Sequence, residues 1–379
     1  MGRHYLDHAS TTPLRPQAAA AIESCLSQLR GDPGRLHEEG REVRALVEDA
    51  REKVAALCQV APRQVIFTSG ATEAINAATW GATRMRPGAK VAVAPVEHSA
   101  VRESSERLAP LVALGVDPDG TLSPAALRAA LLEAGDPPAL VHCQWANHEV
   151  GTIQPVTQVL EVCREVGVPL HVDAAAALGH LEVDVGSLGA DLVSVSAHKL
   201  GGPPGVGALV VRSGLRIPPF MVGGSQERAR RAGMENVVGI AGFGAAAAAL
   251  LEPGARPREE AAARRHIAHL VQAATSLEGV AVVGPQDPSR RLPHVVTFVI
   301  EGIAAEPVLL ALDRLGIAVH SGSACAAEVL EPSPVLQAMG IASEQSLRVS
   351  VGWSTTDQDV AAFAASFPQV VAQVRSLRA

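Results

Sequence analysis

Aromatic side chains, basic charge and long apolar runs are all scarce in this chain of 379 residues. Aromatic residues make up 3% of it and include a single tyrosine, Tyr5. The net charge of −7 at pH 7 provides no basic surface of the kind that binds nucleic acid. No apolar run is long enough to span a membrane, and residues 1–7 lack the apolar core of a signal peptide. We therefore expect a cytoplasmic protein with no nucleic-acid or membrane partner.

Cysteine is also infrequent, and its five copies are scattered: Cys25, Cys58, Cys143, Cys163 and Cys325. An odd number without close spacing argues against a disulfide framework and against a cysteine-based zinc site. Cys25, Cys58 and Cys163 lie in helix-like segments and Cys143 lies in a strand-like one. We expect these four to be small residues of the hydrophobic core, and we treat Cys325 separately.

The first two thirds of the chain alternate apolar strand-like runs with helical patterns. Hydrophobic residues make up 47% and charged residues 19%, which is typical of a globular chain large enough for two domains. The strand-like runs are continuously apolar, as in a parallel sheet that helices cover on both faces. We expect strands at 65–68, 91–94, 140–145, 170–173, 191–196 and 206–211, and helices at 17–29, 38–57, 124–134 and 157–166.

The composition changes after an alanine-rich helix at 241–251. A break at 252–257 precedes shorter strands and further helices, which predicts a second, smaller α/β domain. We expect residues 15–255 to form the large domain and residues 1–14 with 256–379 to form the small one. The expected elements of the second part are helices at 259–277, at 306–315 and from 356, with strands at 280–283, 294–300, near 318 and at 347–351.

Lys199 stands where an apolar strand stops. The run 191–196 is followed by Ala197, His198 and Lys199, and then by a turn rich in glycine and proline. A lysine at such an edge can lose its proton through desolvation and act as an amine nucleophile. A lone lysine can equally cap the strand end in water. The residues expected at the same edge of the sheet are therefore needed to distinguish a nucleophilic lysine from a solvent-exposed one.

Two further features suit a ligand at the same edge. Asp173 closes the strand at 170–173, where a carboxylate faces the crevice at the carboxyl ends of parallel strands. The stretch 68–73, Thr-Ser-Gly-Ala-Thr-Glu, runs from a strand through a glycine turn into a helix. Such a turn offers backbone N–H groups and a positive helix end to an anion, although an ordinary helix cap has the same sequence.

An anion turn, an edge carboxylate and an edge lysine are what pyridoxal phosphate requires. The lysine forms the Schiff base, the acid protonates the pyridine nitrogen, and the turn holds the phosphate. A further side chain has to stack on the ring. Because aromatic residues are scarce, His98, which follows the strand at 91–94, is the candidate, and a helix-capping histidine is the alternative.

The chain resembles the cysteine desulfurases and selenocysteine lyases, class V of the fold-type I pyridoxal-phosphate enzymes, over almost its full length. The resemblance implies an α/β fold, with a large domain around a mostly parallel seven-stranded sheet and a smaller C-terminal α/β domain. The motifs that carry it are Tyr5-Leu-Asp-His-Ala-Ser-Thr-Thr-Pro13, Phe67-Thr-Ser-Gly-Ala-Thr-Glu73, Glu97-His98, His171-Val-Asp-Ala174, the stretch 194–207, Gly223-Gly-Ser-Gln-Glu-Arg228, Ser321-Gly-Ser-Ala-Cys325 and Leu347-Arg-Val-Ser-Val-Gly352.

The resemblance also implies a role for each matching residue. Lys199, Cys325 and His98 would be catalytic: Lys199 carries the cofactor, His98 stacks on its ring and moves protons, and Cys325 receives the substrate sulfur. The implied cofactor ligands are Ala71, Thr72, Ser196 and His198 for the phosphate and Asp173 for the pyridinium nitrogen, and the implied substrate ligand is Arg348. We also expect His148 at the cofactor hydroxyl group and Asn147 at the substrate.

The implied activity is a pyridoxal 5′-phosphate-dependent cysteine desulfurase. It would convert L-cysteine to L-alanine, form a persulfide on Cys325 and pass the sulfur to an acceptor protein. The spacing from Cys325 to Glu331-Pro-Ser resembles the long-loop desulfurases, and the family implies a homodimer. Iron–sulfur assembly, tRNA thiolation and a dedicated biosynthetic pathway all stay open. The alternatives are a selenocysteine lyase, a cystine C–S lyase, or a non-catalytic relative that binds a sulfur-acceptor protein.

Three residues around the expected cofactor depart from the family pattern. His148 stands where the family has an asparagine that meets the pyridoxal hydroxyl, and Ala176 where it has a glutamine. Met234 replaces a threonine that reaches the phosphate of the neighbouring subunit. We expect weaker cofactor binding or altered ring electronics, with His148 taking over the hydroxyl contact.

No metal site is expected. His266 and His269 share a helix face, but no carboxylate partner is evident in the sequence, so we expect them at the surface. Glu259, Glu260 and Arg264 on the same helix are typical of a solvated face.

Overall fold

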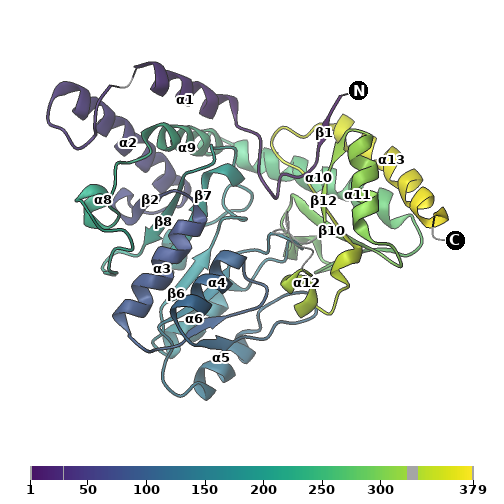
Figure 1. The fold of residues 1–379 in the computed structure, drawn as a ribbon, viewed down its shortest axis with the longest axis horizontal. Coiled ribbons are helices and arrows are strands. Elements are labelled where there is room, and N and C mark those ends of the chain that lie inside the picture. The colour runs from purple at the N-terminus through teal and green to yellow at the C-terminus, as the bar shows by residue number, and fades with distance from the viewer. Residues whose placement is uncertain (1, 29, 322–331, 378–379) are drawn as a thin grey trace.

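The computed structural model describes residues 2–28, 30–321 and 332–377, so Cys325 lies outside the described residues. Figure 1 shows two bodies side by side, one built on a large sheet and one on a smaller sheet near the two chain ends. The division into residues 15–255 and 1–14 with 256–379 stays a prediction. No single described helix is both long and apolar enough to cross a membrane, although the pair α9 (Val237–Leu251) and α10 (Ala255–Thr275), bent by 82°, meets that test when taken together.

Seven strands of the described chain form one twisted sheet (Figure 1). Its spatial order is β2-β8-β7-β6-β5-β3-β4, and all neighbours from β7 to β4 run parallel. Strand β8 is antiparallel to both β7 and β2, so the expectation of a mostly parallel sheet is confirmed. The strands are β2 (Val65–Thr68), β3 (Val91–Val93), β4 (Leu111–Ala113), β5 (Leu140–Gln144), β6 (Leu170–Asp173), β7 (Leu192–Ser196) and β8 (Gly207–Val211).

Helices cover both faces of this sheet, as continuously apolar strands require. Alternate residues of β2 point to opposite faces: Val65 and Phe67 join a core with α2 and α9, while Ile66 joins a core with α3 and α4. Strand β4 was not expected, because it is a short edge strand with exposed residues. The helices here are α1 (Pro16–Gln28), α2 (Glu38–Leu57), α3 (Ala71–Met85), α4 (Ser99–Leu108), α5 (Pro124–Glu133), α6 (Val156–Glu165), α7 (Val185–Leu188), α8 (Gln226–Ala229) and α9 (Val237–Leu251).

The smaller body has an antiparallel sheet of order β12-β13-β10-β9 and its own apolar core. The N-terminal strand β1 (His4–Tyr5) pairs with β11 (Ile317–Ala318), which joins the start of the chain to the smaller body. The other elements are β9 (Val280–Val282), β10 (Val295–Ile300), β12 (His320–Ser321), β13 (Ser346–Ser350), α10 (Ala255–Thr275), α11 (Ala305–Arg314), α12 (Pro334–Ala338) and α13 (Asp357–Ser376).

Helix α10 corrects three expectations. It begins at Ala255 rather than at 259, because Pro257 lies in the first turn, where its missing N–H costs nothing. His266 is buried, not at the surface, and its Nε2 lies 3.0 Å from Oδ1 of Asp357. Glu259 is not simply solvated, since both of its carboxylate oxygens lie 2.7 Å from the guanidinium of Arg15. Both partners come from distant segments.

A buried ion pair fixes the loop before α9 against β2. Both guanidinium N–H groups of Arg51 donate to Glu227 at 2.7 Å, and the two side chains are 2% and 1% exposed. Glu227 also accepts from the backbone N–H of Phe67 at 2.9 Å. Glu227, Arg228 and Ala229 all have positive φ, which non-glycine residues adopt only under strain. The ion pair therefore compensates for local backbone strain.

We predict that Arg51→Ala lowers the free energy of unfolding by about 3–5 kcal/mol, because it leaves Glu227 charged and buried without its partner. Urea denaturation followed by circular dichroism measures the change. The matched control is Arg128→Ala, which breaks a bidentate but exposed ion pair with Glu165 and should lower the free energy of unfolding by about 0–1 kcal/mol. Equal losses for the two variants would contradict the prediction.

Candidate active site

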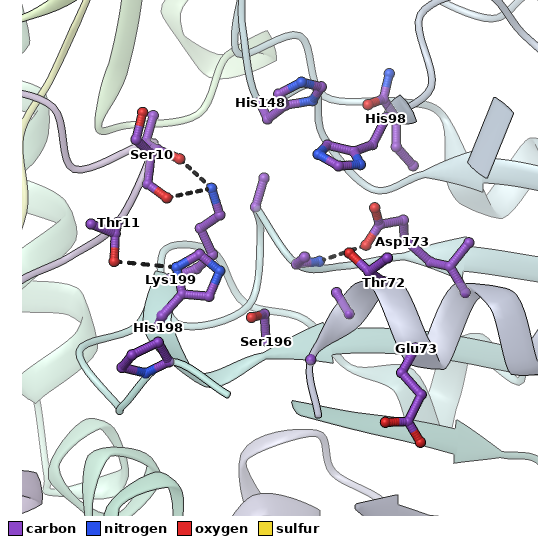
Figure 2. A pocket seen from close by; sticks show the side chains of 18 of the residues that line it. Ser10, Thr11, Thr72, Glu73, His98, His148, Asp173, Ser196, His198 and Lys199 are labelled. Carbon is purple, nitrogen blue, oxygen red and sulfur yellow. Dashed lines mark hydrogen bonds between the residues drawn. The ribbon is translucent and has the colours of Figure 1, made fainter. Parts of the chain in front are cut away.

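A pocket of about 570 Å³ opens beside the carboxyl ends of β5, β6 and β7 and the N-terminus of α3 (Figure 2). Elements far apart in sequence contribute to it, including the N-terminal segment at Ala9–Thr11 and strand β13. The sequence-predicted residues that line it are Ala71, Thr72, His98, His148, Asp173, Ser196, His198, Lys199 and Arg348.

Asp173 ends β6 with its carboxylate at the pocket. Its Oδ1 accepts hydrogen bonds from the hydroxyl of Ser194 at 2.9 Å and from the backbone N–H of Ala175 at 3.0 Å. The described residues make no bond to Oδ2. This carboxylate is therefore held in a fixed orientation and keeps one oxygen for a ligand that donates a proton or carries positive charge.

Lys199 follows β7 in a single helical turn, Ala197–Lys199, and its side chain reaches the N-terminal segment (Figure 2). Its Nζ donates to the backbone carbonyl oxygens of Ala9 and Ser10, the latter at 3.0 Å. The hydroxyl of Thr12 donates in turn to the carbonyl oxygen of Lys199 at 3.1 Å. The amine is thus held at the pocket wall by acceptors that carry no full charge.

The turn between β2 and α3 has the geometry of an anion site. Gly70 adopts φ 157°, and α3 begins at the next residue, so its first N–H groups face the pocket. Gly207 crosses beneath, where a Cβ atom would lie 2.5 Å from the carbonyl oxygen of Val195 and 2.7 Å from the carbonyl carbon of Gly70. A side chain at position 207 would therefore push this turn out of place.

Glu73 ties this turn to the loop before α9. Its Oε2 accepts from the backbone N–H of Ser69 at 2.7 Å, and its Oε1 accepts from Nε of Arg231 at 2.8 Å. Burial alone would raise the pKa of Glu73, but the hydrogen bonds from Arg231 and Ser69 outweigh it and leave that pKa lowered. The carboxylate is therefore ionised, and Arg231 balances its charge beside the anion turn.

Two histidine rings meet on the far side of the pocket. His98 is the N-cap of α4, where its Nδ1 accepts from the N–H of Ala100 at 3.0 Å, so the capping alternative and the pocket position hold together. The rings of His98 and His148 are 5.0 Å apart with an interplanar angle of 61°. Burial, together with the positive charges of Lys199 and Arg348, holds the pKa of His148 well below its usual value, so its ring is neutral.

Arg348 brings a cation from β13 to the pocket wall. Its guanidinium is 1% exposed and donates to the carboxylate of Asp7 at 3.0 Å and to the hydroxyl of Ser10 at 2.6 Å. It also donates to the carbonyl oxygen of His148 at 3.1 Å, whereas its Nε is buried without a partner among the described residues. An anionic group entering the pocket would find a guanidinium that is already oriented.

Asn147 does not line the pocket. Its side chain is buried: the amide donates to the carbonyl oxygen of Val96 at 3.1 Å, and Oδ1 accepts from the N–H groups of Glu149 and Val150 at 2.8 Å. This placement supports a structural role in the turn that carries His148, rather than the substrate contact expected from the sequence. That expectation stays untested.

Comparison with known proteins agrees with the sequence motifs. The family model described as aminotransferase class-V matches residues 4–363. The chain belongs to this family. It is 38% identical over 366 residues to the cysteine desulfurase IscS of Dictyoglomus turgidum, covering 94% of this chain and 91% of that protein. It is 39% identical over 387 residues to the IscS-like cysteine desulfurase of Mycobacterium tuberculosis, covering 98% and 97%. A solved structure of a NifS-like protein superposes with a TM-score of 0.89 at 28% identity, covering 98% of this chain and 100% of the other.

The cysteine desulfurases of the aminotransferase class-V family depend on pyridoxal phosphate, and the residues of this pocket fit that cofactor. Gly207 packs beneath the anion turn without a side chain that would displace it. The N–H groups of the turn can therefore face a phosphate. Asp173 keeps an oxygen for the pyridine nitrogen, and Lys199 reaches the space between them. When bound, the cofactor supplies an electron sink for carbanion chemistry at the substrate Cα.

Sequence reasoning missed a cluster of histidines behind Lys199. The rings of His180 and His294 stack 3.5 Å apart at 17°, and His8 lines the same small cavity. Nδ1 of His8 and Nδ1 of His294 are buried without partners among the described residues. Burial lowers the pKa values of all three, to about 4 for His8 and His180, so the cluster is neutral. No local sequence signal could have joined residues so far apart in the chain.

We predict that Arg231→Ala weakens the binding of pyridoxal phosphate about tenfold, because it leaves the ionised Glu73 unbalanced beside the anion turn. Fluorescence titration of the apoprotein measures the dissociation constant. Arg212→Ala is the control, since Arg212 forms a similar but more exposed pair with Asp191, the residue before β7. A dissociation constant for Arg231→Ala equal to that of the control would refute this role.

Proposed function

We propose that this member of the class-V family is a pyridoxal-phosphate-dependent cysteine desulfurase that converts L-cysteine to L-alanine and transfers the sulfur through Cys325. The observation that carries the proposal is the convergence of Lys199, Asp173, His98 and the anion turn on one pocket. Each comes from a different element, and together they match what the cofactor requires. Cys325 enters from the sequence motif alone, since it lies outside the described residues.

The division of labour follows from the contacts. The guanidinium of Arg348, steadied by Asp7, binds the substrate carboxylate at the pocket wall. Bound cofactor would have its pyridine nitrogen beside Asp173, which would keep that nitrogen protonated, and His98 would cover its ring. Its phosphate would be held by the N–H groups of Ala71 and Thr72, together with Ser196 and His198.

The proton and sulfur transfers then fall to Lys199 and Cys325. The Lys199 amine would take the proton from the substrate Cα. The Cys325 thiolate attacks the substrate sulfur: an S–S bond forms, the C–S bond breaks, and its electron pair stays with the carbon skeleton. Protonation of Cβ, with His98 as the nearby acid, and return of the proton from Lys199 to Cα complete L-alanine. The products are alanine and a persulfide on Cys325, which an acceptor protein takes over.

We predict that Lys199→Ala abolishes both the borohydride-reducible cofactor adduct and the release of sulfide and alanine from L-cysteine. The amine is both the attachment point and the base, so no other group replaces it. Mass spectrometry after reduction detects the adduct. A wild-type protein that takes up no cofactor under any loading condition would instead favour the non-catalytic relative.

A second prediction concerns Cys325→Ser. This variant should keep the visible colour of the bound cofactor and lose sulfide release from L-cysteine in the presence of a thiol reductant, because a serine hydroxyl cannot hold a persulfide. Cys163→Ser is the control, since Cys163 is buried away from the pocket in α6. Undiminished activity of Cys325→Ser would favour a C–S lyase, and activity confined to selenocysteine would favour the lyase of that substrate.

We also propose a cytoplasmic homodimer that delivers sulfur to an acceptor protein, with iron–sulfur assembly among the candidate pathways. The dimer is supported by exposed apolar side chains in the segment that precedes α9: Val222 is 80% and Met234 62% exposed. Sedimentation of wild type against Val222→Asp tests the dimer. A monomer at micromolar concentration in the wild type would exclude it.

A further inference from the structure

The shape of pyridoxal phosphate decides which side of the pocket its hydroxyl group faces; this step rests on the proposed function. The phosphate arm and the hydroxyl group lie on opposite sides of the axis that joins the aldehyde carbon to the ring nitrogen. With the phosphate at the anion turn, the nitrogen at Asp173 and the aldehyde at Lys199, the hydroxyl faces away from Ser196. In Figure 2, His148 lies on that opposite side.

His148 is available for this contact. Its side chain is 13% exposed and lines the pocket, and neither ring nitrogen forms a hydrogen bond within the described part of the chain. Ala176, which also lines the pocket, offers only a methyl group. The backbone of His148 is fixed, because its carbonyl oxygen accepts from Arg348 at 3.1 Å. A neutral imidazole can either donate or accept at a given nitrogen, depending on which nitrogen carries the proton.

Glu149 is the group that can determine which ring nitrogen of His148 carries the proton. Its Oε1 lies 3.6 Å from Nε2 of His148, which is ion-pair distance and one small ring rotation from a hydrogen bond. Its other oxygen, Oε2, accepts from the hydroxyl of Ser333 at 2.6 Å. Its backbone N–H donates to Asn147, and its carbonyl oxygen accepts from Thr297 at 2.8 Å. The carboxyl group is therefore rigid, and the imidazole is the part that adjusts.

The surroundings leave the proton on this pair adjustable. The charged or titratable groups facing His148 are His98 and Arg102 at the start of α4, Lys199 from the turn after β7, and Arg348 from β13. The histidines His8, His180 and His294 line a small cavity that His148 also borders. Burial and these neighbours keep the imidazole neutral. Burial also raises the pKa of Glu149 to about 7, against the Ser333 hydrogen bond and the charges of Arg348, Arg102 and His98, which lower it.

We propose that Glu149 sets the tautomer of His148 and thereby determines whether His148 donates a hydrogen bond to the cofactor hydroxyl group or accepts one from it. When Glu149 is protonated, it donates to Nε2, and the imidazole proton sits on Nδ1 as a donor toward the hydroxyl oxygen. When Glu149 is ionised, it accepts from Nε2–H, and Nδ1 is an acceptor. Between these states one proton passes from Glu149 to solvent, while the hydroxyl proton is redistributed within the bound cofactor.

The effect of Glu149 on the cofactor depends on which amino acid stands at position 148. An asparagine there presents its amide independently of any neighbouring proton, whereas a histidine transmits the charge of Glu149 to the cofactor. Glu149 is thus a positioning residue, and His148 is the group in contact. The visible absorbance of Lys199-bound cofactor requires the ionised hydroxyl form, and the neutral form absorbs in the near ultraviolet. The ratio of these two bands therefore reports the state of the pair without any turnover.

The test is an absorbance titration of the holoenzyme from pH 5.5 to about 8.5, a window centred on the pKa of Glu149, about 7. In the wild type, the visible band should fall and the near-ultraviolet band rise with a midpoint near pH 7. Glu149→Gln retains an acceptor for the Ser333 hydroxyl and should lose the change in band ratio near pH 7. His148→Asn should lose it as well. Ser333→Ala removes a bond that favours the ionised carboxylate and should move the midpoint to higher pH.

Two controls isolate the effect. Glu97→Gln removes a different buried carboxyl group, whose pKa burial raises to about 8, and should leave the step in place. Wild-type protein loaded with 3-deoxypyridoxal phosphate, which lacks the hydroxyl group, should show no step that depends on Glu149. A step that persists unchanged in Glu149→Gln, or a Ser333→Ala midpoint equal to that of the wild type, would overturn the proposal.

The outcome separates this proposal from the proposed function. A protein that takes up cofactor and releases sulfide, but whose titration ignores Glu149, refutes only the tautomer control. A protein that takes up no cofactor refutes the proposed function. If the tautomer control holds, His148→Ala should weaken cofactor binding about tenfold more at pH 6, where the hydroxyl contact is charge-assisted, than at pH 8.

Discussion

The site depends on the docking of the N-terminal segment against the turn after β7. Backbone N–H groups of Thr12 and Arg15 donate to the carbonyl oxygens of His198 and Gly201 at 3.0 and 2.9 Å. Nε of Arg15 donates to the carbonyl oxygen of Leu200 at 2.8 Å, while its other nitrogens pair with Glu259. These bonds hold a loop at the wall of the pocket without forming a regular strand pair.

The same segment links the two bodies of the molecule. A few residues upstream, Asp7 and Ser10 bind the guanidinium of Arg348, which comes from the small sheet. The carbonyl groups of Ala9 and Ser10 bind the amine of Lys199, which comes from the large sheet. A single stretch of chain therefore aligns the two cations of the pocket, and a shift of that stretch would move both. The neutral histidines behind it add no charge that would repel them.

Much of the large sheet could be predicted from the sequence, because its strands are buried on both faces and therefore read as unbroken apolar runs. Helix α2 matched residue for residue, since its apolar stripe is long and regular. Cys25, Cys58, Cys143 and Cys163 proved buried, as expected. Strand β4 and helix α12 were missed, because each is short and β4 is an edge strand that pairs with β3 alone among the described strands.

The errors at single residues share a physical cause. The ion pair of Glu259 and the burial of His266 depend on Arg15 and Asp357, which approach only when the chain folds. The expected substrate contact of Asn147 stays a prediction, and no pattern along the sequence reports that its side chain bonds to Val96 and Glu149. The residues that converge on the pocket were found because each ends an apolar strand or begins a helix, where the topology of parallel sheets gathers them at one edge.

The cap formed by His98 has a consequence for the chemistry it faces. Because Nδ1 accepts the N–H of Ala100, a neutral His98 has to carry its proton on Nε2, the nitrogen left for the pocket. The helix thereby fixes this ring as a donor. A neutral ring that lost this proton would become an imidazolate, so in the proposed function a proton can leave Nε2 only if another reaches Nδ1, and the bond from Ala100 to Nδ1 has to open to admit it.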